Sequence, residues 1–347
     1  MKVLLIKMSS MGDIFHTFPA VTDLLKFRPD IELHWVVEEG FAEIVSWHPG
    51  VARIIPIALR KWMKLRNRSA WKEFRAWKAE LNKTQYDLVI DAQGLLKSLL
   101  IAKSSHSNNI QGYDKQSARE SWVSFFYHQG YFVDKNLHAV QRTRQLLSKI
   151  GQYAINHHFS FGIQQFFAPI QKKPKQLVFV IGTSWTTKLW DPEKWKRLTQ
   201  LALAAGYQVD IVWGSEDEKF LADSIIQACS GSTRPDKRMS ITAVAQKLVA
   251  ATGVVGLDTG FSHLSGALEI PTIALYGATS PTKVGLIGEH THNLQLENPL
   301  DCMPCHKRQC KLLPEKSTDC PPCLKLISAP LVWNQLLVKL ASEHIEN

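Results

Sequence analysis

Near the start of the chain, an aspartate lies between a short apolar run and a predicted helix. The stretch MSSMGDIFHTFPA covers residues 8–20, and Asp13 follows the run that ends at Lys7. With Ser10 three residues earlier, Asp13 could form a capping box, in which both side chains accept hydrogen bonds from free N–H groups. The alternative is catalytic, because open α/β sheets bind substrates at the carboxyl ends of their strands. A carboxylate there could remove a proton from an attacking hydroxyl group.

A second strand-to-helix junction is typical of a phosphate site. The stretch VVGLDTGFSH, residues 254–263, has Asp258, Thr259 and Gly260 at the turn and His263 one helical turn later. The free N–H groups and the positive dipole end of a helix start bind anions such as a diphosphate. Simple capping of the helix by Asp258 or Thr259 explains the stretch equally well.

Two further predicted strands end in polar loops. Thr183 and Ser184 begin a hydroxyl-rich loop that also carries Lys188, so these residues could hold phosphate oxygens without a metal. Glu218 lies in a loop after a later strand, where it could accept hydrogen bonds from ribose hydroxyls. Each loop alone is also typical of ordinary solvated turns. Because three such loops would meet at one edge of a parallel sheet, together they favour a nucleotide site.

A basic, tryptophan-containing run occupies residues 59–80, LRKWMKLRNRSAWKEFRAWKAE. Arg60, Lys61 and Lys64 lead it, and only two glutamates oppose its eight basic residues. Such runs are usually solvated helix faces. The interleaved tryptophans favour contact with phosphates or lipid headgroups, although nucleic-acid binding would give a similar pattern.

Five cysteines gather in the stretch CMPCHKRQCKLLPEKSTDCPPC, residues 302–323. Two C-x-x-C pairs are typical of zinc ribbons, with His306 as a further candidate ligand. In a cytoplasmic protein, structural zinc is favoured over a disulfide. The candidate ligands are Cys302, Cys305, Cys310, Cys320 and Cys323.

These residues need parallel sheets to bring them together, and the chain alternates short β-rich runs with helical stretches. We expect strands at 3–6, 32–37, 53–57, 88–91 and 109–112, and at 177–181, 208–212, 254–257 and 272–276. The sequence therefore predicts a first domain over 1–160 and a second over 175–327, joined by a linker within 156–174. We expect a last helix over about 329–343, within the terminal segment 328–347, to cross back onto the first domain.

Composition limits the class of protein. The 347 residues carry a formal charge of +10, and residues 1–160 hold 22 Lys and Arg against 14 Asp and Glu. The excess predicts an anionic partner on the first domain. The start of the chain does not resemble a signal peptide and no apolar run is long enough to span a bilayer, so we expect a cytoplasmic protein. The absence of G-x-G-x-x-G and Walker A motifs disfavours a nicotinamide dehydrogenase.

Six stretches resemble the lipopolysaccharide heptosyltransferases of glycosyltransferase family 9, most closely their heptosyltransferase I branch. They are SSMGDIFHTFPAVTD (9–23), WVVEEGFAEIVSWHPGVARIIPIALRKW (35–62), YDLVIDAQGLLKS (86–98), SARES (117–121), HAVQRTRQLL (138–147) and LDTGFSHLSGAL (257–268). The DTGFSH and SSMGD segments are general to the family, whereas WVVEEGFAEI and ALRKW are typical of the first heptosyltransferase. The resemblance covers most of the chain.

The resemblance implies an α/β protein of the GT-B class, with two Rossmann-like domains facing a central cleft. The N-terminal domain would bind the acceptor and the C-terminal domain the nucleotide sugar. It implies inverting transfer of L-glycero-D-manno-heptose from ADP-heptose to the Kdo of Kdo-lipid A, without a catalytic metal. The charge pattern predicts peripheral attachment to the anionic inner leaflet of the cytoplasmic membrane, and we expect no nucleic-acid partner.

The resemblance also assigns residues to roles. Asp13 would be the general base. The donor contacts would be Thr183, Ser184, Lys188, Glu218, Met239, Asp258, Thr259, Gly260 and His263. The acceptor contacts would be Arg60, Lys61, Lys64 and Arg119.

This chain departs from the family pattern in two places. Met63 stands where another cation is often found, and the cysteine-rich segment is absent from the enteric heptosyltransferase I pattern. One alternative is therefore a sister glycosyltransferase with another donor sugar or a later core acceptor, as in heptosyltransferase II. The alternative from another class is a basic zinc-ribbon protein that binds nucleic acid.

Overall fold

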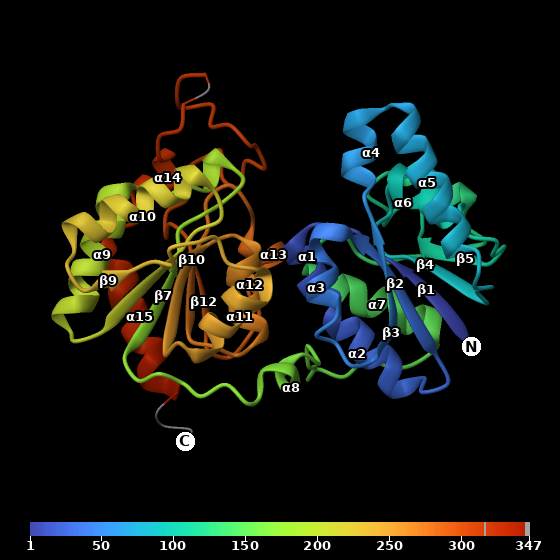
Figure 1. The fold of residues 1–347 in the computed structure, drawn as a ribbon, viewed down its shortest axis with the longest axis horizontal. Helices are drawn as coiled ribbons and strands as arrows, with labels where there is room; N and C mark the ends of the chain where they lie inside the picture. Colours follow the sequence, from blue (N-terminus) through green and yellow to red (C-terminus); the bar gives the residue numbers. More distant parts are fainter. Residues whose placement is uncertain (316, 344–347) are drawn as a thin grey trace. The chain divides into compact units, whose positions relative to one another are not determined.

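The computed structural model describes residues 1–315 and 317–343, and it divides into two compact units, Met1–Phe166 and Phe167–Asn347. Each unit contains one parallel sheet with helices on both faces (Figure 1). Among the described residues, no helix has the length and apolar character needed to cross a membrane. The boundary between the units falls inside the predicted linker, within the short helix α8 (Gln164–Phe167).

The first unit contains a six-stranded sheet in the order β3-β2-β1-β4-β5-β6. Its strands are β1 (Lys2–Ile6), β2 (Glu32–Glu38), β3 (Val51–Ile57), β4 (Leu88–Asp91), β5 (Ile110–Tyr113) and β6 (Gln129–Tyr131). Its helices are α1 (Met11–Phe15), α2 (Phe18–Phe27), α3 (Ala42–Val45), α4 (Leu59–Leu65), α5 (Arg68–Leu81), α6 (Leu96–Ala102) and α7 (Ala139–Gly151), with 3-10 turns η1 (Glu39–Phe41) and η2 (Ser121–Phe126).

The second unit repeats this topology, because its strand order β12-β11-β10-β7-β8-β9 is the same pattern read from the other edge. Its strands are β7 (Gln176–Val180), β8 (Gln208–Val212), β9 (Ser232–Thr233), β10 (Gly253–Leu257), β11 (Thr272–Leu275) and β12 (Thr291–Leu294). Its other elements are η3 (Thr186–Lys188), α9 (Pro192–Ala204), α10 (Glu216–Ala228), α11 (Ile241–Ala250), α12 (Gly260–Ala267), α13 (Pro281–Val284), α14 (Pro322–Lys325) and α15 (Ala329–Glu343). This is the strand order of the dinucleotide-binding Rossmann fold.

The last helix, α15, belongs to the second unit. It packs against α9 and strands β10–β12, and Val332, Trp333 and Leu336 join the core of that unit. This differs from the expected return to the first domain. The physical reason is that these apolar side chains cover one face of the second sheet, beside α9 (Figure 1).

The short helix α1 is anchored by its apolar residues. Ile14 and Phe15 are fully buried, and the Phe15 ring stacks on Trp47 with 6.3 Å between centroids. Phe18, at the start of α2, packs edge-on against Trp35 of β2 at 5.7 Å. This packing fixes the turn after β1 and holds Asp13 at its exposed side.

Candidate active site

Several of the predicted site residues lie where each sheet changes its direction of winding. In the first unit, β1 pairs with β4, and in the second unit, β7 pairs with β10. The helices that follow such a strand pair leave in opposite directions, so the carboxyl ends of the two strands border a crevice that can hold a ligand. Asp13 follows β1, whereas Thr183 follows β7 and Asp258 follows β10.

Asp258 is the centre of the polar cluster in the second unit. Its Oδ2 lies 2.6 Å from Lys188 Nζ, and its Oδ1 lies 3.3 Å from His263 Nε2. Lys188 Nζ also donates to the backbone oxygen of Asp258 at 3.3 Å, and the Thr279 hydroxyl donates to Oδ2. The sequence therefore correctly places three of its predicted donor residues together, although they come from two separate loops.

The charge of Asp258 is stabilised by these partners. Burial alone would raise the pKa of its carboxyl group, but the hydrogen bond with His263 and the positive charge of Lys188 hold that pKa well below its usual value. The side chains of Asp258 and Lys188 form a buried ion pair, which is a stable arrangement only while both partners are present.

The start of α12 is not capped by a side chain. Thr259 is the N-cap residue, yet within the described part of the chain its buried hydroxyl has no hydrogen-bond partner and caps no N–H group. Asp258 is committed to Lys188, His263 and Thr279 instead. The capping explanation of this stretch is therefore wrong, and the N–H groups that begin at Gly260 remain available to an anion.

Two residues that the sequence analysis missed belong to this cluster. Thr279 binds Asp258 directly, and the fully buried Tyr276 has a hydroxyl without a partner among the described residues. Burial, followed by the nearby charge of Asp258, raises the pKa of Tyr276 well above its usual value. Both residues follow β11, whose carboxyl end lies beside that of β10. Only the position of this strand in the sheet could have indicated that they lie near Asp258.

Glu218 lies beside the loop that follows β7. Its Oε2 accepts a hydrogen bond from the Gly214 N–H at 2.6 Å, and a Cβ atom added at Gly182 would lie 2.2 Å from its carboxyl carbon. A larger residue at position 182 would displace this carboxylate from its present position. The loops after β7 and β8 are therefore brought together, as the sequence predicts.

The remaining predicted donor residues line the edges of this region. Thr183 is half-buried and accepts a hydrogen bond from the Trp185 N–H at 3.4 Å, Ser184 is exposed, and Met239 is half-buried just before α11. Two cations lie over the Trp185 ring. Lys188 Nζ is 4.6 Å from the ring centroid, and the guanidinium carbon of Arg308 is 5.5 Å from it. Neither Trp185 nor Arg308 was predicted from the sequence.

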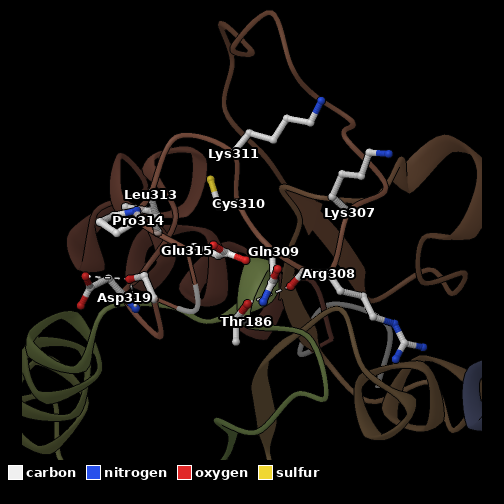
Figure 2. Close-up of a pocket in the computed structure, with 11 residues that line it drawn as sticks. Thr186, Lys307, Arg308, Gln309, Cys310, Lys311, Leu313, Pro314, Glu315 and Asp319 are labelled. Atoms are coloured by element: carbon white, nitrogen blue, oxygen red, sulfur yellow. Dashed lines mark hydrogen bonds between the residues drawn. The ribbon is translucent and has the colours of Figure 1, made fainter.

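A hollow of about 690 Å³ adjoins this loop (Figure 2). Thr186 lines it together with residues of the cysteine-rich segment, including Arg308 and Lys311. The Thr186 hydroxyl donates to the Arg308 backbone oxygen at 2.8 Å. The segment thus packs directly against the loop that carries Lys188.

In the first unit, Asp13 is 42% exposed. Its Oδ2 accepts hydrogen bonds from the backbone N–H and the hydroxyl of Ser10, both at 2.7 Å, and its Oδ1 lies 4.0 Å from Lys7 Nζ. The carboxylate reaches back to the N-cap as the capping interpretation predicts. It also keeps solvent-exposed surface, so both roles are compatible with its geometry.

A second carboxylate, which the sequence analysis did not single out, lies at the end of β4. Asp91 is fully buried and accepts hydrogen bonds from Ser98 and Tyr127, each at 2.8 Å, and from the N–H groups of Gln93 and Gly94. Burial raises the pKa of Asp91, although these hydrogen bonds lower it. With its oxygens engaged in this way, Asp91 shapes the turn after β4.

The predicted acceptor residues are exposed cations that differ in whether a carboxylate already pairs with them. Arg60 has its guanidinium 5.5 Å from the Phe41 ring centroid and 4.0 Å from Glu38, whereas Lys61 is paired with Glu73 of α5 at 2.9 Å. Lys64 is exposed on α4, and Arg119 is exposed in the loop before η2. The structure thus places three of these cations on one short helix.

Among the described residues, no three His, Cys, Asp or Glu side chains are arranged to hold a metal ion. The predicted zinc ligands are free thiols in this structure, and Cys323 is buried whereas Cys302 is exposed. The zinc interpretation therefore stays a prediction.

Comparison with known proteins identifies the family. The sequence model of glycosyltransferase family 9 (heptosyltransferase) matches residues 74–316. The lipopolysaccharide heptosyltransferase 1 of Pseudomonas aeruginosa is 40% identical over 321 residues, which cover 90% of this chain and 88% of the relative. The chain belongs to glycosyltransferase family 9. The predicted family is confirmed, and the match does not favour a nucleic-acid-binding protein.

Two solved structures of the Escherichia coli heptosyltransferase WaaC share the fold. The structure with ADP is 38% identical, has a TM-score of 0.80, and covers 84% of this chain and 92% of its own. The structure with ADP-2-deoxy-2-fluoro heptose is 37% identical, has a TM-score of 0.79, and covers 85% and 93%. The predicted GT-B fold is therefore confirmed, and this family 9 protein is a heptosyltransferase.

The lowered pKa of Asp258 makes its contribution to stability depend on pH. A carboxyl group with a lowered pKa in the folded state stabilises the protein above its unfolded pKa of about 4, and this contribution is lost as the pH falls below that value. We expect Asp258→Asn to lower the melting temperature most at pH 7, and the difference from wild type to narrow towards pH 3. Scanning calorimetry between these values measures it. Asp217→Asn, an exposed control on α10, should show no such convergence, and a constant difference for Asp258→Asn would contradict the prediction.

Proposed function

We propose that this heptosyltransferase moves L-glycero-D-manno-heptose from ADP-heptose to the Kdo of Kdo-lipid A, in lipopolysaccharide inner-core biosynthesis. Binding of the ADP-heptose donor is supported above all by the uncapped start of α12. There the Thr259 hydroxyl is buried and has no hydrogen-bond partner among the described residues. The relatives support heptose transfer from ADP-heptose in lipopolysaccharide synthesis, since they are named lipopolysaccharide heptosyltransferase 1 and the WaaC structures contain ADP or an ADP-heptose analogue. The Kdo acceptor rests on the resemblance of the chain to the heptosyltransferase I branch.

The second unit would bind the donor through complementary groups. The diphosphate would lie at the N–H groups of Gly260 and Phe261, beside the Thr259 hydroxyl and Lys188. Thr183 and Ser184 would donate to its oxygens, and Glu218 would accept from the ribose hydroxyls. Met239 would contact the base, while Asp258 and His263 would orient Lys188.

In the first unit, Asp13 would act as the general base. Its carboxylate takes the proton of the attacking acceptor hydroxyl as the new bond to the anomeric carbon forms. The bond from that carbon to the diphosphate breaks on the opposite face of the sugar, and its electron pair leaves with the nucleotide. This displacement inverts the anomeric carbon. General-base assistance of this kind contributes about 10² to 10⁴-fold to the rate.

The departing diphosphate would be stabilised by fixed positive groups. Lys188 and the start of α12 are both positioned before the reaction begins, so little reorganisation is needed as charge develops. We propose that they make a catalytic metal ion unnecessary. Turnover should then be unchanged when Mg²⁺ is added or omitted.

The first test measures the reaction itself. Mass spectrometry of Kdo-lipid A after incubation with ADP-heptose should show the gain of one heptose. Asp13→Asn should lower turnover by about 10² to 10⁴-fold, because a neutral amide cannot accept the proton. Asp30→Asn, an exposed control between α2 and β2 at the opposite end of the strands, should keep wild-type turnover.

Each other outcome has a defined meaning. Wild-type turnover by folded Asp13→Asn would reduce this residue to a helix cap. Addition of heptose only to an already heptosylated core would assign the enzyme to the alternative with a later acceptor. A mass gain from another ADP-sugar, but none from ADP-heptose, would reject the proposed donor.

The second test concerns the phosphate site. Lys188→Ala should weaken ADP binding about 10- to 100-fold, since a hydrogen bond to a charged group contributes about 1.5–3 kcal/mol. Titration calorimetry measures the affinity, and a melting curve checks that the variant remains folded. Lys196→Ala removes a lysine that pairs with Glu193 on α9 and should bind ADP normally. Equal affinity in both variants would move the phosphate site elsewhere.

The acceptor side would use the basic groups of the first unit. Arg60, Lys61, Lys64 and Arg119 would bind the phosphates and carboxylates of Kdo-lipid A. Because this acceptor is a lipid, we also propose that the first unit docks on the anionic inner leaflet of the cytoplasmic membrane.

An exposed apolar surface lies on α6 and η2, the two elements that flank Arg119 in the sequence. The docking surface consists of Leu96 and Leu100 of α6 and Trp122, Phe125 and Phe126 of η2. The Glu120 carboxylate joins the two elements by accepting the Leu96 N–H at 2.7 Å. Phe125 is 76% exposed, which for a large apolar side chain favours an interaction surface. Aromatic rings and nearby cations together suit the interface of an anionic bilayer.

The third test measures membrane binding. The wild-type protein should sediment with vesicles that contain phosphatidylglycerol, and less so as salt is raised. The double variant Phe125→Ser, Phe126→Ser should lose most of this binding. Phe220→Ser removes a 71% exposed ring from α10 of the second unit and serves as the matched control. If both variants bind vesicles as the wild type does, the docking surface is rejected while the transferase reaction is untouched.

A further inference from the structure

The cysteine-rich segment lies at the end of the long connection from β12 to α14, residues 295–321, which forms no helix or strand in its described residues, and its last cysteine, Cys323, lies in α14. Loops of this length without secondary structure are uncommon in compact domains. Ordering such a segment costs conformational entropy, which metal clips that close long loops can offset. The segment nevertheless packs closely, because Met303 and Cys320 contact the main core of the second unit.

Four of the five cysteines in this segment line one small cavity. Cys302, Cys305, Cys310 and Cys323 surround a space of about 20 Å³, which is room for about one water-sized particle. The fifth, Cys320, does not line it. The four therefore form a C-x2-C-x4-C-x12-C pattern, which combines a C-x-x-C pair with two later thiols, as structural zinc sites do.

The backbone leaves space for the most distant of these thiols. A Cβ atom added at Gly277 would lie 2.7 Å from Cys323 Sγ, so the thiol packs directly over the glycine. Gly277 follows β11, in the same loop as Thr279, which binds Asp258. The cavity thus adjoins the back of the donor site.

We propose that Cys302, Cys305, Cys310 and Cys323 bind one structural zinc ion. In this structure the thiols surround the cavity without forming a ligand set. Zinc binding needs the exposed Cys302 and the half-buried Cys305 and Cys310 to turn towards the buried Cys323. Each thiol loses its proton on binding, and the four thiolates complete a tetrahedral site.

The segment also holds the loop of Lys188 in place. The Thr187 hydroxyl donates to the Lys307 backbone oxygen at 2.6 Å, the Thr186 hydroxyl donates to that of Arg308, and the His306 N–H donates to the Ala278 oxygen at 2.8 Å. These contacts connect the segment to both loops that contact Asp258. The zinc ion would therefore position Lys188, a role that rests on the proposed donor site.

Metal analysis of the purified chain tests the site. Protein produced with zinc in the medium and purified without chelators should contain one zinc per chain by plasma mass spectrometry. Cys323→Ser and Cys305→Ser should lose it, whereas the matched control Cys320→Ser should keep it. Zinc that is retained by Cys323→Ser but lost from Cys320→Ser would overturn the ligand set.

If a cysteine variant fails to fold, two measurements on the wild-type chain still test the zinc site. Replacement of zinc by Co²⁺ should give the visible absorption of a tetrahedral thiolate complex. Intact mass under non-reducing conditions should show all six cysteines reduced after the metal is removed. No bound metal, or a mass lower by two hydrogens for each disulfide, would overturn the proposal.

The positioning role has its own readout. If zinc holds the Lys188 loop, folded Cys305→Ser should bind ADP several-fold more weakly than Cys320→Ser. Loss of zinc with unchanged ADP affinity would reject this role and keep the metal site. Failure of ADP to bind even the zinc-loaded wild-type chain would instead reject the proposed donor site.

Discussion

The chemistry of the second unit depends on one buried carboxylate. Asp258 is only 6% exposed, and burial of an unpaired charge at this depth would cost several kcal/mol. Lys188 and His263 offset that cost, and Thr279 adds a further hydrogen bond. Asp258 is engaged by these partners and does not cap α12. The ion pair therefore fixes Lys188, and the first N–H groups of that helix are left without a side-chain cap.

The same topology holds one aspartate in each unit, and the two aspartates differ in how deeply they are buried. Both sheets have the same strand order, and both place an aspartate after a strand at the point where the winding reverses. In the second unit that aspartate is buried and paired. In the first, the Asp13 side chain remains 42% exposed, because the neighbouring Ile14 and Phe15 provide the burial that anchors α1. Burial, and not the fold, therefore separates a positioning carboxylate from one that can exchange a proton with a substrate.

Much of this could be predicted from the sequence because the central strands are apolar and the loops after them are polar. Strands β1, β4, β8 and β10 are close to their predicted bounds, whereas β6, β9 and β12 were missed. These three are short strands at or next to sheet edges, and their polar residues give no apolar run. The site shows the same limit. Asp258 and Lys188 were found from their own loops, but Tyr276 and Thr279 belong to the site only through tertiary packing.

The ion pair also explains why a lysine and not an arginine suits position 188. The ammonium group has three N–H donors. Two of them are directed at Asp258, one at its carboxylate and one at its backbone oxygen. The Trp185 ring covers the charge at 4.6 Å, and no further acceptor contacts Nζ among the described residues. One donor is therefore left without an acceptor among the described residues. The guanidinium of an arginine would instead hold its donors in one plane as a fixed fork, and would not reach the carboxylate and the backbone oxygen of Asp258 from a single nitrogen atom as Nζ does. The buried aspartate thus fixes the position of Nζ and leaves it one donor for a further partner.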